Sequence, residues 1–144
     1  MGSRAMRLDY PAKVLLAWGE AISGHTGLRD WLLHNGYPEL GVFCHALLLQ
    51  QDARDWLVAQ GHPHLMAVIH ATEGNKQALA WLEQQGLGAL KQLALCGDGD
   101  LDAQRWLVEH GHRELAVIGS RIHKVKRRID EENSDYHRYS GLNG

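Results

Sequence analysis

The sequence predicts an all-α fold, an α-solenoid or superhelix of about four 25-residue helix-pair repeats with degenerate caps. Three observations predict it: a tryptophan returns every 25 residues, a leucine directly follows each one, and a glycine comes five residues later. A fixed period of this length is typical of a unit that buries its apolar face only by stacking on copies of itself. The repeating residues are Trp31, Trp56, Trp81 and Trp106, then Leu32, Leu57, Leu82 and Leu107, then Gly36, Gly61, Gly86 and Gly111.

Each repeat is expected to form two short helices. The first carries apolar residues at the i, i+3, i+4 spacing of one helical face, as in Ala53, Trp56 and Leu57. The recurrent glycine is expected to end this helix, because glycine adopts the left-handed conformation of a helix end without steric cost. A second helix then shows the same apolar spacing, as in Leu65, Val68 and Ile69. We expect the tryptophans to pack between successive repeats as part of the core.

The two ends of the chain depart from the repeat. Residues 11–22 are expected to form the second helix of a degenerate first repeat, because Leu15 and Ala21 lie 25 residues before Leu40 and Ala46. Residues 8–129 are therefore predicted to form a single helical-repeat domain. Residues 130–144 are polar, poor in aliphatic residues and rich in turn formers, so we expect a flexible C-terminal tail.

Composition limits the kind of partner and compartment. The formal net charge of −2 gives no global electrostatic attraction towards nucleic acid or anionic membranes. No apolar run approaches the ~18–20 residues that a membrane span needs. Cys44 and Cys96 lie on apolar stretches at different repeat positions, as expected of reduced, buried thiols rather than a disulfide. We therefore expect a cytoplasmic protein.

One stretch of the sequence resembles a known repeat family. Residues 93–111, LALCGDGDLDAQRWLVEHG, followed by Leu115, are similar to the leucine-rich repeat variant, whose short helical units contain an acidic loop, an arginine and a turn proline. The resemblance implies a short α-solenoid and no activity. The cysteine cluster that some members place before their repeats for an iron–sulfur centre is absent from this sequence, so no cofactor is implied. The matching residues are Asp98 and Asp100, Arg54 and Arg105, and Pro38 and Pro63.

The residue pattern predicts no catalytic site and no metal site. Cys44 and His45 are adjacent, so on a helix they point about 100° apart and cannot form a thiolate dyad. Some of the ten histidines recur in register, such as His45 with His70. Equivalent residues of stacked helices lie about 10 Å apart, too far for one ion with bonds of about 2 Å. We therefore expect a protein that is not an enzyme and that needs no cofactor.

The favoured hypothesis is a binding module or scaffold for a protein or peptide partner. Two positions on each second helix, four residues apart, vary freely between repeats, so they are expected to form one exposed stripe across the stacked units. The partner's identity does not follow from the sequence, no membrane is involved, and a monomer is expected. The predicted partner-binding residues are His45, Met66, His70, Lys91, Leu95 and Ser120.

The alternative hypothesis is a helical-repeat protein that binds nucleic acid through a basic helix near its C-terminus. The basic run could contact phosphates. Acidic residues follow it at once, and Arg127 with Glu131 and Arg128 with Glu132 have the i, i+4 spacing of local helix pairs. These pairs favour a solvated terminal helix instead. The residues of the alternative site are Lys124, Lys126, Arg127 and Arg128.

Overall fold

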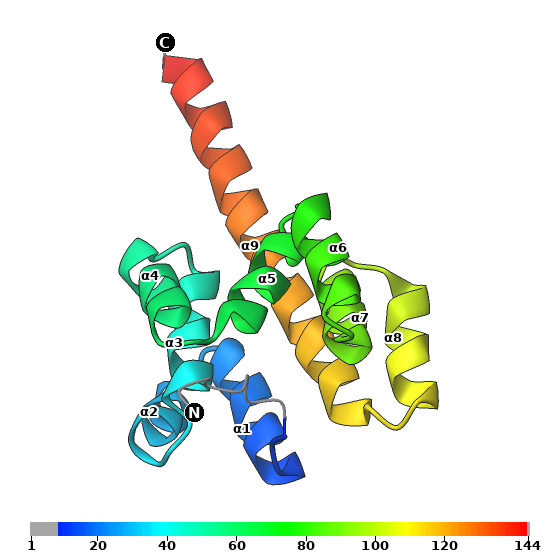
Figure 1. The fold of residues 1–144 in the computed structure, drawn as a ribbon. Helices are drawn as coiled ribbons and strands as arrows, with labels where there is room; N and C mark the ends of the chain where they lie inside the picture. The colour runs from blue at the N-terminus through cyan, green and yellow to red at the C-terminus, as the bar shows by residue number, and fades with distance from the viewer. Residues whose placement is uncertain (1–8, 144) are drawn as a thin grey trace.

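The prediction of an all-α fold is confirmed by the computed structural model, which describes residues 9–143 and side chains up to residue 134. Within residues 9–143 there are nine α-helices and no strand (Figure 1). Their bounds are α1 Ala12–Ile22, α2 Thr26–His34, α3 Pro38–Leu47, α4 Gln51–Ala59, α5 Pro63–Thr72, α6 Lys76–Gln84, α7 Gly88–Gly97, α8 Leu101–Glu109 and α9 Arg113–Asn143.

The helix boundaries follow the spacing of the sequence. α3, α5, α7 and α9 begin 25 residues apart, and so do α2, α4, α6 and α8. The helix expected at residues 11–22 is present as α1. The recurrent glycines end the first helices in the left-handed conformation, as predicted, with φ of 95°, 85°, 73° and 81° at Gly36, Gly61, Gly86 and Gly111.

The helices form an inner ring and an outer set. α1, α3, α5, α7 and α9 each contact the next, and α1 also packs against α9, so these five close into what we call the inner ring (Figure 1). The other four, which we call the outer helices, each contact the two inner helices that flank them in sequence. One residue from each inner helix, at the same position of the 25-residue spacing, forms a buried layer with exposures of 0–1%: Trp18, Phe43, Val68, Leu93 and Ile118.

The contact between α1 and α9 was not predicted, since a linear stack keeps its first and last units apart. Polar contacts join the two helices. Arg121 Nη2 lies 3.0 Å from Glu20 Oε1, and Arg121 Nη1 donates a hydrogen bond of 2.7 Å to Ser23 Oγ. Gly19 allows the close approach, because a Cβ there would lie 3.3 Å from Arg121 Cδ. Residues about 100 positions apart therefore hold the ring closed.

The prediction that the tryptophans form the core between repeats holds only in part, because three of the four, Trp56, Trp81 and Trp106, pack against the core without being fully buried. The fully buried residue of each outer helix is instead the leucine after the tryptophan, at 0% exposure in every case. Trp31 is 40% exposed, and the other three repeat tryptophans are half-buried. Trp31 stacks on Tyr37, with ring centroids 6.2 Å apart and planes 19° apart, and Trp56 and Trp106 stack in the same way on His62 and His112. These indoles therefore pack against the turn that follows their own helix.

The C-terminal part of the chain is helical where we expected a tail. α9 continues past Ile129 to Asn143, and its end projects beyond the other helices (Figure 1). Arg127 Nη2 lies 3.5 Å from Glu131 Oε1, an i, i+4 pair that favours helix continuation. The flexibility of this segment stays a prediction. No helix within residues 9–143 combines the length and the apolar character that crossing a bilayer requires.

Candidate functional site

The predicted binding stripe does not lie on the surface as expected. Met66 is only 4% exposed, so its predicted exposure is wrong. In α3 and α7 the equivalent position faces the preceding outer helix instead. A Cβ on Gly41 would lie 2.7 Å from the Leu33 side chain of α2, and Lys91 Nζ lies 2.8 Å from Glu83 Oε2 of α6. The residue type at this position differs between these two repeats because it contacts a different side chain of the outer helix in each.

The other predicted stripe residues are spread over different environments. His70 is exposed, and its Nδ1 lies 3.7 Å from Glu73 Oε1. His45 is half-buried, and burial, together with the charge of Arg29, lowers the pKa of its imidazole. Leu95 packs on the small apolar cluster around α8, and Ser120 is half-buried. The six residues form no continuous exposed face, and their role in binding stays a prediction.

The basic residues of the alternative site are partly engaged within the chain. Lys126 Nζ donates a hydrogen bond to the Thr72 carbonyl at the end of α5 and lies 3.6 Å from Asp98 Oδ1. Arg127 pairs with Glu131 along α9. Lys124 and Arg128 are exposed. Lys126 therefore joins α9 to the ends of α5 and α7, where a cation also complements the negative end of a helix dipole.

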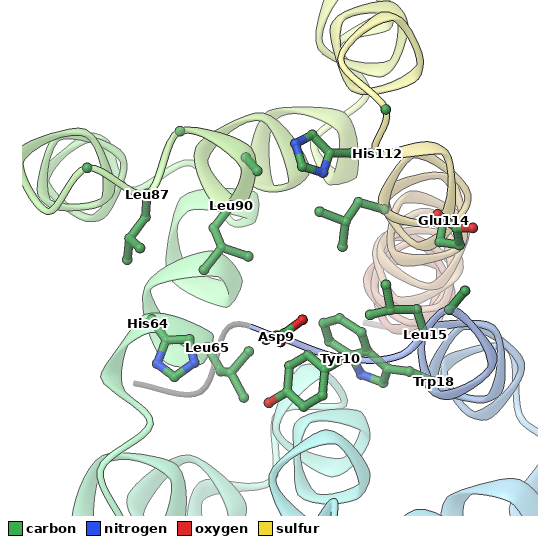
Figure 2. Close-up of a pocket in the computed structure, with 16 residues that line it drawn as sticks. Asp9, Tyr10, Leu15, Trp18, His64, Leu65, Leu87, Leu90, His112 and Glu114 are labelled. Carbon is green, nitrogen blue, oxygen red and sulfur yellow. The ribbon is translucent and has the colours of Figure 1, made fainter. Parts of the chain in front are cut away.

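A pocket of about 440 Å³ lies within the inner ring, at the end where the inner helices begin (Figure 2). We call it the axial pocket. Its walls include one leucine from each of four inner helices, and these leucines lie at equivalent positions of the 25-residue repeat. The equivalent leucine of α3, Leu40, does not line the pocket. Trp18, whose ring meets that of Phe43 edge-on at a centroid distance of 4.9 Å, also lines the pocket. The four wall leucines are Leu15, Leu65, Leu90 and Leu115.

Polar groups lie around the same pocket. Asp9, Tyr10, His64, His112 and Glu114 all line it. His64 is fully buried, at 0% exposure. The first turns of α1, α5, α7 and α9 line it, so the partial positive charge of four helix N-termini adds to the local field. An apolar chamber with a few polar groups, within the ~300–1,000 Å³ typical of ligand sites, suits a ligand with an apolar body and a polar end.

The two cysteines are poor nucleophiles. Burial raises the pKa of Cys44 to about 12, and burial together with the charge of Asp100 raises the pKa of Cys96. Each thiol donates to a backbone carbonyl, Cys44 Sγ to Leu40 O at 3.5 Å and Cys96 Sγ to Ala116 O at 3.7 Å. A thiol held in this form does not supply the thiolate that covalent catalysis needs. Among the described residues, no three His, Cys, Asp or Glu side chains gather as a group that could hold a metal.

Sequence reasoning missed the axial pocket because it treated the leucines of the second helices as uniform core. Leu40 and Leu65 are buried to 2% exposure or less, whereas Leu15, Leu90 and Leu115 are only half-buried. Leu15 and Leu115 line one pocket because α1 meets α9. One signal was present: Gly88 and Ala89 place very small side chains at the start of α7, where they leave the pocket open.

The chain matches no known family model, and neither the curated proteins nor the solved structures contain a significant match to it. The likeness to the leucine-rich repeat variant therefore stays an expectation from the residues quoted for it.

Proposed function

We propose that this chain is a short helical-repeat solenoid whose ends meet, and that it is a non-enzymatic binding module for a protein or peptide partner. The axial pocket is the observation that carries the proposal, and it replaces the second-helix stripe as the proposed binding site. The proposal also includes a monomeric state, and a cytoplasmic location as the composition led us to expect.

The pocket suits the anchoring of one apolar residue of a flexible segment. Burial of a Leu-sized or Phe-sized side chain contributes about 1.5–3 kcal/mol, so a single anchor gives useful but reversible affinity. Asp9 and His112 at the same site can hydrogen-bond to the peptide backbone around the anchor. Because the walls belong to several helices of a closed ring, the site is held in shape before the ligand arrives, which lowers the entropic cost of binding.

A substitution that fills the pocket tests this proposal. Gly88 lines the pocket at the start of α7, and a Cβ built there meets no atom within 4 Å, so Gly88→Phe should fold normally. Peptides would be selected by phage display against the unsubstituted protein, and their affinity for each variant would be measured by fluorescence anisotropy. We expect Gly88→Phe to weaken the selected peptides at least tenfold. Peptide titration should also shift the amide resonances of Gly86, Gly88 and Gly111 in NMR spectra.

The matched control is Leu101→Phe, which adds a ring at a residue of α8 that is 72% exposed and does not line the pocket. It should leave peptide affinity unchanged. Equal binding by both variants, or resonance shifts confined to residues away from the pocket, would disprove the assignment of this site. A selection that enriches no sequence motif would also contradict it.

A further inference from the structure

Four junctions between neighbouring inner helices are each covered by an outer helix, and the fifth is not covered by any helix within residues 9–143. α2 covers α1 and α3, α4 covers α3 and α5, α6 covers α5 and α7, and α8 covers α7 and α9. The fifth junction, between α9 and α1, has no outer helix within residues 9–143, because α9 continues straight where the next outer helix would begin. We call this junction the closing seam.

The closing seam repeats the packing register of a covered junction. Gly119 of α9 lies against α7, where a built Cβ would be 2.5 Å from Cys96 Sγ. Gly19, exactly 100 positions before Gly119, lies against Arg121, which is 25 positions after Cys96. α1 therefore sits against α9 at the register that α9 has against α7. The junction of α7 with α9 and the junction of α9 with α1 therefore have the same packing between their inner helices. They differ because α8 covers the first junction and no helix within residues 9–143 covers the second.

The covered junction shows which residues an outer helix hides. α8 buries Ala103 and Leu107, at 2% and 0% exposure, in a cluster with Cys96 and Ala116, at 5% and 3%. The residue of the closing seam equivalent to Ala116 is Leu16, which is 56% exposed. Val117, one residue further along α9, is 41% exposed. The seam thus presents exposed apolar side chains, and Leu16 lies at the position where α5 and α9 bury Met66 and Ala116.

The charges around the closing seam are mainly positive. By helical spacing, Lys13 and Glu20 share a face with Leu16. Glu114 and three basic residues share a face with Val117: Arg113, Arg121 and Lys124. Four basic residues therefore stand against two acidic residues. Arg121 pairs with Glu20 across the seam, and the other three cations are exposed. This balance favours a partner helix that carries acidic residues beside its apolar face.

We propose that the closing seam binds a short, acidic, amphipathic α-helix of another protein, which occupies the position that α8 occupies on α7 and α9. The four outer helices of this chain define the chemistry of the occupant: about nine residues, with apolar side chains at i, i+3 and i+4 and one leucine that inserts fully. This site lies on the outside of the ring and is distinct from the axial pocket.

The probe is a synthetic peptide with the sequence of residues 100–109, DLDAQRWLVE, stapled on its polar face to hold the helix and labelled with fluorescein. It has three acidic residues and one basic residue. We expect saturable binding that Leu16→Asp weakens at least tenfold. A peptide in which Leu107 is replaced by Asp should bind at least tenfold more weakly to the unsubstituted protein.

The matched control is Val58→Asp, because Val58 is an equally exposed apolar residue, at 59%, on the outer helix α4. It should bind the probe as the natural sequence does, and both variants should keep the same helicity and melting temperature. Gly88→Phe should also leave this affinity unchanged, which separates this test from that of the axial pocket. Equal binding by Leu16→Asp, or no binding at all, would overturn the proposal. A dimer in sedimentation that Leu16→Asp dissociates would assign the seam to a second copy of the chain instead.

Discussion

The inner ring and the outer helices differ in how much of each helix is buried. α5 of the inner ring buries eight of its ten residues, whereas α6 of the outer set buries only Leu82 among nine. α2 and α4 likewise bury one leucine each, Leu32 and Leu57. The inner ring therefore supplies most of the core, and each outer helix inserts one fully buried leucine into it. Helices that bury so few of their residues are expected to open locally before the whole domain unfolds.

The largest expected effect distinguishes the two kinds of tryptophan. Trp18 of the inner ring is 1% exposed and packs on Phe43, so Trp18→Ala should lower the free energy of unfolding by about 3–5 kcal/mol. Trp31 of the outer helix α2 is 40% exposed, and Trp31→Ala should cost about half as much or less. Urea denaturation followed by circular dichroism measures both. Equal losses would show that the outer tryptophans contribute to the core as fully as the inner one.

A second prediction concerns local opening of an outer helix. Leu82 is the only buried residue of α6, so Leu82→Ala should cost roughly 2–3 kcal/mol, at the low end for a buried leucine because α6 can relax around the cavity. Hydrogen exchange should then accelerate more at the amides of α6 than at those of α5. If both helices exchanged at the same increased rate, the inner ring and the outer helices would be a single cooperative unit.

The smallest expected effect lies at a turn from an inner to an outer helix. Leu49 has φ of 69°, whereas the residues at the equivalent turns are glycines, Gly24, Gly74 and Gly99. A residue with a side chain in the left-handed conformation destabilises the folded state by roughly 1–2 kcal/mol, a cost that glycine avoids. Glycine in turn costs about 0.5–1 kcal/mol, because its backbone loses more conformational entropy on folding. Leu49→Gly should therefore stabilise the protein by up to about 1 kcal/mol. The reverse substitution Gly74→Leu should lower the melting temperature, and a loss of stability in Leu49→Gly would show that the Leu49 side chain makes a compensating contact.

The sequence predicted the features that depend on local spacing. The i, i+3, i+4 pattern predicted paired helices, and the recurrent glycines predicted where the outer helices end, which the positive φ of Gly61 and its equivalents confirms. It could not predict which apolar residue of each Trp-Leu pair is buried, because both lie on the same face and only the position of the inner ring decides. Leu57 is buried completely, and Trp56 lies on His62 instead.

The candidate site could not be predicted from the sequence for a related reason. The axial pocket and the closing seam both exist because α1 meets α9, and this contact joins residues such as Glu20 and Arg121 that are 101 positions apart. A period tells how one unit packs on the next. It does not give the rotation per unit that decides whether the fifth inner helix returns to the first. Met66 was placed on the surface for the same reason, since the pattern alone does not show which side of α5 faces α4.

The pairing of α1 with α9 also has a consequence for synthesis of the chain. Translation proceeds at about 5–20 residues per second, so about 100 residues take on the order of 5–20 s to follow Glu20 out of the ribosome. During that interval the face of α1 that will meet α9 has no permanent neighbour, and the ring stays open until its final member has been made. The nascent chain therefore exposes one apolar face of α1 for many seconds, and we expect chaperone protection of this helix to matter during that time.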